Sequence, residues 1–303
     1  MKIFITGGGG FVGRHLAKYL LEKKFKVTIF DDLSNCTQEM IGSIGNVNFV
    51  KGDIRDYELL KKSMRNHELV IHLAAKTSVS DSNENQENVI DVNVKGSHNV
   101  LKSCNNCNIS KIIIISSAAV YGDGLESKPH NEDTSTNPVS VYGKSKLEME
   151  NTVKEFSRTS NLDSIIFRLF NVYGEGQSDA YAGVIKKFVN CAVQNKPVLI
   201  YGKGDQTRDF IHVNDVIEYI VRAIKNIEWK KGEIYNIGTG KPISIKQLAI
   251  DIFSIFEKNL IINYAKTLDG DIKFSSTKID KSEKMLDYSP KIGLKDGIAK
   301  TFC

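Results

Sequence analysis

A tyrosine and a lysine four positions apart are the pair in this sequence best placed for acid–base chemistry. Tyr142 and Lys146 stand at helical spacing, so both side chains project from one face. A phenol with a pKa of about 10 is a poor base at neutral pH, but a nearby ammonium favours the phenolate. Ser117 closes an apolar run of strand length and could hydrogen-bond the same substrate oxygen. The three residues together predict removal of a hydroxyl proton by Tyr142.

A glycine-rich turn near the N-terminus predicts a site for a dinucleotide. Gly7, Gly10 and Gly13 form GxxGxxG directly after an apolar run, and a helical pattern follows. Glycines let the backbone approach a pyrophosphate, and the helix N-terminus offers it free N–H groups. An acidic residue at the end of the second run can accept hydrogen bonds from adenosine ribose hydroxyls. The residues expected to contact the dinucleotide here are Gly7, Gly10, Phe11, Val12, Gly13, Asp31 and Asp32.

The residues after Asp31 favour NAD over NADP. No Arg or Lys occurs in the next seven positions, so a 2′-phosphate would meet Asp31 and Asp32 without a cation. A second acidic segment, Asp53 and Ile54, follows the third apolar run. Asp53 either lies near the adenine amino group or forms a turn or helix cap before Tyr57.

Apolar runs of strand length alternate with helical patterns along the chain. Several runs are apolar nearly throughout, which suits a parallel sheet covered on both faces. The expected strands are Lys2–Thr6, Lys26–Phe30, Asn48–Lys51, Leu69–Leu73, Lys111–Ser116 and Ser164–Leu169. The expected helices are Phe11–Lys23, Tyr57–Met64, Val89–Cys104, Val141–Ser160, Val213–Ile227 and Ser244–Glu257.

This alternation predicts an α/β fold with a doubly wound, Rossmann-type parallel sheet. After Arg168 the rhythm breaks into loops rich in Gly, Asn and Asp, which we interpret as a smaller, partly interleaved α/β domain that faces the substrate. We expect the dinucleotide-binding domain over residues 1–168 and about 208–235. The substrate-binding region is expected over residues 169–207 and 236–303.

Composition argues against several other classes of protein. The 303 residues are 41% hydrophobic and 25% charged, with a net charge of +5. The basic residues are scattered, whereas nucleic-acid binding needs a clustered patch. No apolar stretch of about 18 residues occurs and the N-terminus lacks a signal-peptide pattern, so we expect a cytoplasmic protein without a membrane span. The five cysteines suggest reduced thiols, and Cys104 and Cys107 lack the further ligands of a zinc site, so no metal is expected.

Together the motifs resemble those of the NAD-dependent epimerase/dehydratase family, over nearly the whole chain. Besides the glycine turn and the Tyr142–Lys146 segment, the resemblance is carried by residues 116–122 (SSAAVYG), 168–174 (RLFNVYG), 204–210 (GDQTRDF) and 235–238 (YNIG). Within the family, the chain is most similar to UDP-glucose 4-epimerases. The resemblance implies NAD as the cofactor, a nucleotide sugar, UDP-linked, as the substrate, and a homodimer.

The resemblance also implies roles for single residues. It gives Ser117, Tyr142 and Lys146 the catalytic roles, with Lys146 also binding the nicotinamide ribose. The nicotinamide side is then lined by Leu73, Ala74, Ala75 and Asn93. The sugar nucleotide meets Asn171, the backbone of Ala182, Gly183 and Val184 near its diphosphate, Tyr201 at the nucleobase, and Arg208 at a phosphate. The alternatives are that Asn171 only holds a loop and that Tyr201 belongs to the core.

Two segments depart from the family pattern. An Arg-x-Gly-Asp run, which supplies a second phosphate contact, is replaced by Leu268-Asp269-Gly270-Asp271, and an Ala-Asp-Ile-Ser-Lys run by residues 277–281 (TKIDK). Either Lys266 or Lys273 replaces the lost cation, or binding is weaker, or the ligand differs. In the 4-epimerases that this chain resembles, the residue seven positions after that arginine borders the C2 substituent of the sugar. Here it is Ser275, whose small side chain leaves room for an acetamido group.

The residues after Ser117 favour one reaction within the family. Dehydratases and decarboxylases place acidic residues there for additional acid–base work, whereas this chain has Ala118 and Ala119. Forming, rotating and reducing a 4-keto sugar needs only the serine, the tyrosine and the nicotinamide. We therefore expect an NAD-dependent epimerase of UDP-glucose and UDP-galactose or their N-acetyl forms. The alternatives are a 4-keto-sugar reductase, a UDP-glucuronate 4-epimerase, and a scaffold that binds NAD without chemistry.

Overall fold

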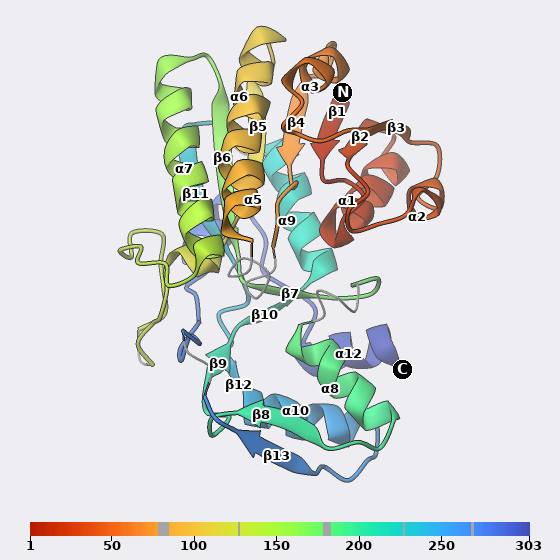
Figure 1. The fold of residues 1–303 in the computed structure, drawn as a ribbon, viewed down its shortest axis with the longest axis vertical. Helices are drawn as coiled ribbons and strands as arrows, with labels where there is room; N and C mark the ends of the chain where they lie inside the picture. Colours follow the sequence, from red (N-terminus) through yellow and green to blue (C-terminus); the bar gives the residue numbers. More distant parts are fainter. Residues whose placement is uncertain (78–84, 127, 178–182, 227, 268–269) are drawn as a thin grey trace.

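The computed structural model describes residues 1–77, 85–126, 128–177, 183–226, 228–267 and 270–303. Its centre is a parallel seven-stranded sheet in the order β11-β6-β5-β4-β1-β2-β3 (Figure 1). The strands are β1 (Lys2–Thr6), β2 (Lys26–Asp31), β3 (Asn48–Lys51), β4 (Leu69–His72), β5 (Lys111–Ser117), β6 (Asp163–Leu169) and β11 (Lys231–Ile237). The doubly wound parallel sheet predicted from the sequence is confirmed.

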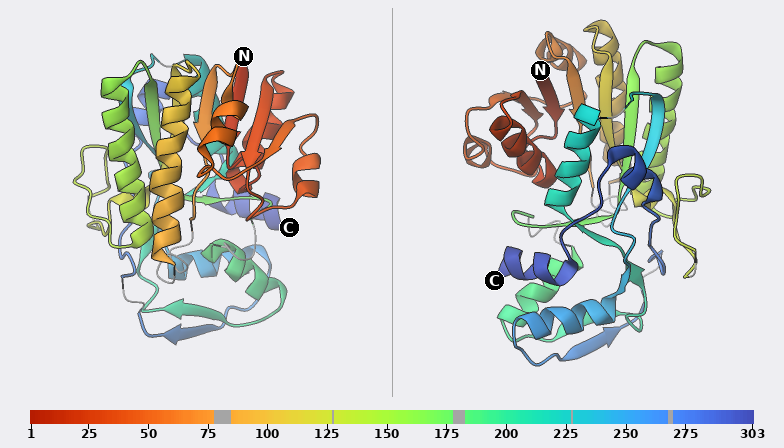
Figure 2. Two further views of the ribbon diagram at one scale, coloured as in Figure 1. Left: turned by 45° about the horizontal axis from the view of Figure 1, so that its top comes forward. Right: turned by 180° about the vertical axis from the view of Figure 1, so that it is seen from behind.

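Helices cover both faces of this sheet (Figure 2). One face carries α1 (Phe11–Glu22) and α9 (Val213–Asn226), and the other carries α3 (Tyr57–Met64), α6 (Ser97–Asn106) and α7 (Val141–Thr159). Successive strand residues point to opposite faces, so Ile3 and Ile5 pack with α1 and α9 while Phe4 packs with the opposite set. Because both faces are buried, the strands read as continuous apolar runs.

A third core forms a smaller part below the carboxyl ends of the strands in Figure 1. Its elements are α8 (Val184–Val193), β8 (Val198–Tyr201), α10 (Ile245–Ile255), β13 (Ile262–Ala265) and α12 (Leu294–Phe302). Short strand pairs connect it to the sheet: β7 (Asn171–Tyr173) with β10 (Phe210–His212), and β9 (Thr207–Arg208) with β12 (Ile243–Ser244). The carboxyl edge that faces this part is where doubly wound folds bind ligands.

The remaining described elements are short. They are α2 (Gln38–Gly42), α5 (Gln86–Ile90), the π-helical segment η1 (Asp91–Gly96), the 3-10 helix η2 (Ala118–Val120) and α11 (Asp280–Leu286). The single helix expected over Val89–Cys104 is therefore the succession of α5, η1 and α6. Among the helices that the structure describes, none is both long enough and apolar enough to span a bilayer.

Candidate active site

The glycine turn leaves room for nothing larger than hydrogen at two of its positions. A Cβ atom on Gly7 would lie 2.5 Å from the Ala74 backbone nitrogen, and one on Gly13 would lie 2.5 Å from the Gly7 carbonyl oxygen. Gly7 also has a φ of 68°, which favours glycine. The N-cap of α1, Gly10, offers no side-chain cap to the first helical N–H groups, those of Phe11 and Val12 among them. This cradle fits the pyrophosphate of a dinucleotide.

Asp31 stands at the end of β2, against the glycine turn. Its buried carboxylate accepts hydrogen bonds from the backbone N–H of Gly9 at 2.9 Å and of Leu33 at 2.9 Å. Burial raises the pKa of Asp31, and the two backbone N–H groups oppose that rise. A fixed acceptor beside a pyrophosphate cradle is the arrangement that adenosine ribose hydroxyls require.

Asp53 is engaged by its own segment. Arg55 Nη2 donates to Asp53 Oδ2 at 2.6 Å, and the Arg55 backbone N–H donates to Asp53 Oδ1 at 2.8 Å, which makes a turn. The cap of α3 is Asp56, which accepts from the Leu59 N–H, so the expectation of an Asp53 cap is wrong. The side chain of Ile54 is buried in the core beside Gly96.

Asn93 lies beneath the loop that follows β4. Its buried amide accepts from the Lys76 backbone N–H at 2.8 Å and donates to the Lys76 carbonyl at 3.0 Å and to Ser145 Oγ at 3.0 Å. Its side chain is therefore used to join this loop to α7. The residues just before Lys76 continue β4: the Leu73 N–H donates to the Thr6 carbonyl, Ala74 closes over Gly7, and Ala75 is half-buried.

The start of α7 brings Tyr142 to Ser117. Ser140 caps the helix by accepting from the Gly143 N–H at 3.0 Å. A Cβ atom on Gly143 would lie 2.6 Å from the Ala119 carbonyl oxygen, so glycine lets the first turn pack against η2. Ser117 Oγ accepts from the Ala119 N–H at 3.1 Å, and the Tyr142 phenol lies close enough to Ser117 for the two side chains to interact.

The electrostatics of this pair depend on burial. Burial raises the pKa of Tyr142, and the hydrogen bond with Ser117 opposes the rise. Lys146 is 3% exposed, and its Nζ donates to the Ile115 carbonyl at 2.8 Å. Burial lowers the pKa of Lys146 to about 8, with the charge of Glu150 acting in the opposite direction. Burial therefore works against the phenolate form of Tyr142 in the free protein.

A buried polar network lies under these residues, and sequence reasoning missed it. Glu150, one helical turn after Lys146, pairs with Arg168 through contacts of 2.9 and 2.7 Å and accepts from Ser116 Oγ at 2.6 Å. Arg168 also donates to the Tyr121 hydroxyl at 2.9 Å. The side chains of Glu150 and Arg168 are 0% and 2% exposed. The available signal in the sequence was that Glu150 lies four positions after Lys146 and therefore on the same face of the helix. A glutamate on a face that is buried predicts a charged partner, since charged residues are rarely buried unless they are paired.

Asn171 and Gly183 lie at the starts of two elements that follow β6, the strand β7 and the helix α8. Both the backbone N–H and the side-chain amide of Asn171 donate to the Asp209 carbonyl, so Asn171 does hold a loop. Gly183 is the N-cap of α8, which begins at Val184 without a side-chain cap. An uncapped helix start suits a diphosphate. Ala182 and Leu268 lie outside the described residues.

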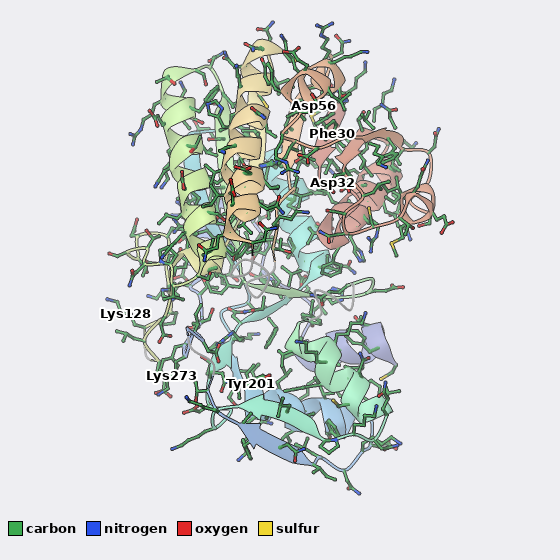
Figure 3. All side chains as sticks on the ribbon, viewed as in Figure 1. Phe30, Asp32, Asp56, Lys128, Tyr201 and Lys273 are labelled. Atoms are coloured by element: carbon green, nitrogen blue, oxygen red, sulfur yellow. The ribbon has the colours of Figure 1, made fainter. Side chains whose placement is uncertain are left out.

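Tyr201 ends β8 and is 38% exposed, so its assignment to the core is wrong. Figure 3 shows it with Lys273 in the smaller part, with Asp32 at the large sheet above. Lys266 is exposed, and Lys273 Nζ stands over the Phe274 ring.

Arg208 is already paired within the chain. Its Nη2 donates to Asp271 Oδ1 at 2.6 Å, and its Nη1 donates to the Thr207 carbonyl at 2.8 Å. The segment that lacks the family arginine thus supplies an acid to Arg208. Ser275 follows in the same stretch of chain; it is buried, and its N–H donates to the Thr207 carbonyl. It belongs to no strand.

Comparison with known proteins decides the family. The model described as "NAD dependent epimerase/dehydratase family" matches residues 3–238. The chain belongs to this family. A member from Methanocaldococcus jannaschii, named "Putative UDP-glucose 4-epimerase", is 37% identical over 98% of this chain and 96% of its own length.

Solved structures of epimerase/dehydratase family members agree with the fold. The UDP-glucose 4-epimerase of Thermotoga maritima, solved with UDP-glucose, has a TM-score of 0.94 and 30% identity and covers 100% of this chain and 97% of its own. The UDP-N-acetylglucosamine 4-epimerase of Methanobrevibacter ruminantium, solved with UDP-N-acetylmuramic acid, has a TM-score of 0.92 and 30% identity over 99% and 96%. As a family member, the protein is an enzyme of nucleotide-sugar chemistry with NAD as its cofactor.

Proposed function

We propose that the protein is a UDP-sugar 4-epimerase that works through a transient 4-keto sugar. The observation that carries the proposal is the pairing of Ser117 with Tyr142 next to a turn, η2, that begins with two alanines. Ala118 packs against the apolar cluster of Val120, Tyr121 and Phe170. The positions where a dehydratase would need an acid are therefore occupied by side chains without acid–base chemistry.

The chemistry follows from the residues at the pair. Tyr142, as the phenolate, takes the proton of the sugar C4 hydroxyl while Ser117 donates a hydrogen bond to the same oxygen. Lys146, as an ammonium, favours that phenolate. NAD supplies the hydride acceptor for C4 and the hydride that returns to the opposite face of the rotated 4-keto sugar. Tyr142 finally gives its proton back to the C4 oxygen, so the sugar gains and loses nothing.

The sugar nucleotide would be held from the smaller part. The uncapped start of α8 at Val184 and the guanidinium of Arg208 suit the diphosphate. Because Asp271 already pairs with Arg208, the diphosphate would compete with this carboxylate for the cation. The exposed ring of Tyr201 would stack near the nucleobase.

The proposed substrates include N-acetyl sugars. The supporting feature is the small side chain of Ser275, which lies beside β9. An aromatic side chain at this position would take the space that an acetamido group needs, and overpacking by a whole ring costs more than adding a few methylenes. UDP-N-acetylglucosamine would then be epimerised as well as UDP-glucose.

A panel of UDP-sugars tests the proposal. The enzyme is incubated with UDP-glucose, UDP-galactose, UDP-N-acetylglucosamine and UDP-glucuronate, and C4 epimers are read by NMR. We expect epimers without net NADH. Net change of the cofactor would instead indicate a 4-keto reductase, turnover of UDP-glucuronate alone a glucuronate epimerase, and no turnover an NAD-binding scaffold. Light scattering during gel filtration tests the proposed homodimer.

A further inference from the structure

We propose that Lys76, held by Asp32, is a second determinant of the choice between NAD and its 2′-phosphorylated form. This choice of cofactor does not depend on which sugar the enzyme takes.

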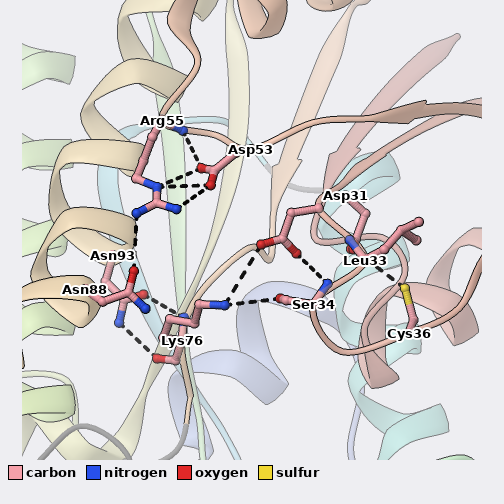
Figure 4. A network of polar contacts seen from close by, with 10 residues as sticks. Asp31, Leu33, Ser34, Cys36, Asp53, Arg55, Lys76, Asn88 and Asn93 are labelled. Carbon is pink, nitrogen blue, oxygen red and sulfur yellow. Dashed lines mark hydrogen bonds and ion pairs between the residues drawn. The ribbon is translucent and has the colours of Figure 1, made fainter. Parts of the chain in front are cut away.

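Lys76 reaches the loop after β2 from the loop after β4 (Figure 4). Its Nζ lies 3.9 Å from Asp32 Oδ2 and donates to Ser34 Oγ at 3.2 Å. The seven residues that follow Asp31 in the sequence include no cation for a 2′-phosphate. The fold brings one from 44 residues away.

Hydrogen bonds hold the segments that carry Lys76 and Asp32. The N–H and the carbonyl of Lys76 are bound by the buried amide of Asn93, which in turn is bound to Ser145 on α7. Asp32 Oδ1 accepts from the Ser34 N–H at 2.8 Å. A lysine anchored in this way has less freedom to lose when it binds a ligand than an ordinary surface lysine has.

The position of the pair points to the 2′ carbon of the adenosine ribose. An acid at the end of β2 binds the ribose hydroxyls, and a cation nearby is what accommodates a 2′-phosphate. Asp32 is the residue next to Asp31, and it forms an ion pair with the Lys76 ammonium. As long as Asp32 is charged, a 2′-phosphate meets two carboxylates and a cation already in use. When the Asp32 carboxylate is removed by substitution, Lys76 becomes available to the phosphate.

A double-mutant cycle tests the coupling. Dissociation constants of NAD and NADP are measured by calorimetry, after removal of copurified nucleotide, for the wild type, Asp32→Ser, Lys76→Met and the double variant. We expect Asp32→Ser to improve NADP binding relative to NAD by about tenfold, the scale of one hydrogen bond to a charged group. In the Lys76→Met background most of this gain should disappear. Lys95→Met, which removes an exposed lysine paired with Asp91, is the matched control.

Two outcomes would overturn the proposal. If Asp32→Ser gives the same gain with and without Lys76, Asp32 acts alone. If Lys76→Met weakens NAD and NADP by the same factor, Lys76 contacts a part of the cofactor that both share. Asp32→Asn keeps the shape of the side chain, so it gives the same comparison if Asp32→Ser does not fold.

Discussion

Burial disfavours the charged forms that Tyr142 and Lys146 need for catalysis. Tyr142 must lose a proton to act as a base, yet burial raises its pKa. Lys146 must carry a charge to help, yet burial lowers its pKa to about 8. The free protein is thus poorly set for proton transfer, and a bound cationic nicotinamide would supply what is missing.

Tyr142→Phe tests the base directly. The variant should keep its fold and bind NAD normally, because only a hydroxyl is removed. Turnover should fall by at least about a hundredfold, the scale of losing a general base. Epimer formation by NMR measures it, and Tyr264→Phe, on an exposed tyrosine, is the control. Near-native turnover would remove Tyr142 from its role.

Lys146→Met should separate stability from activity. Between about pH 8 and 10.5 the unfolded chain holds a proton that folded Lys146 lacks, so the free energy of unfolding rises with pH in that window. Below about pH 8, the folded protein carries the buried ammonium of Lys146, which destabilises it. The variant should therefore be inactive but more stable at pH 7 by up to about 3 kcal/mol, and its advantage should shrink as pH rises towards 10.

Denaturant unfolding at several pH values measures this advantage. Lys144→Met, on an exposed lysine of the same helix, is the control. A Lys146→Met variant less stable than the wild type at every pH would contradict the assignment.

At the scale of elements, the Glu150–Arg168 pair joins α7 to β6, and Ser116 extends the link to β5. The two elements that carry the catalytic residues, β5 and α7, are therefore joined to β6 through one buried ion pair. Such a pair is costly to break, because the partner left behind is a buried unpaired charge.

Glu150→Gln should have two separable effects. The free energy of unfolding should fall by about 3–5 kcal/mol, since Arg168 loses its counterion. Because the charge of Glu150 raises the pKa of Lys146, the alkaline limb of the kcat profile should also move to lower pH. Adding Arg168→Met should restore part of the stability and leave the pH shift in place. A shift that disappears together with the instability would mean that Glu150 has only a structural role.

Elements were easier to predict from the sequence than contacts between them. The first six strands of the sheet have ends within one or two residues of those expected, because strands buried on both faces are plainly apolar. Helix α8 was missed although Ile185, Phe188 and Val189 show its spacing. The meeting of Lys76 with Asp32 could not be predicted, since periodicity does not say which loops approach each other.

At the scale of the whole molecule, the proposed site lies between the sheet and the smaller part. Ser117 and Tyr142 come from the sheet side, whereas Arg208 and Ser275 belong to the stretch near β9 and β12. Substrate size would thus be set by residues other than those that perform the proton transfer.

Ser275→Tyr tests this separation. The ring should suppress kcat/KM for UDP-N-acetylglucosamine selectively, because the acetamido group and the ring would compete for the same space. UDP-glucose, which lacks that group, is the internal control. The measurement is kcat/KM for both substrates in the wild type and the variant. An unchanged ratio of the two kcat/KM values would contradict the hypothesis.

The strand β11 completes the sheet only late in synthesis. It pairs with β6, and about 60 residues lie between the two strands. At translation rates of about 5–20 residues per second, β6 is an unpaired edge strand of the nascent sheet for roughly 3–12 s. Its residues Ile165 to Phe167 are apolar, and an unpaired apolar edge strand can pair with strands of other chains and so cause aggregation. Chains that stop between Leu169 and Lys231 should therefore be largely insoluble on expression, although they contain the whole catalytic set.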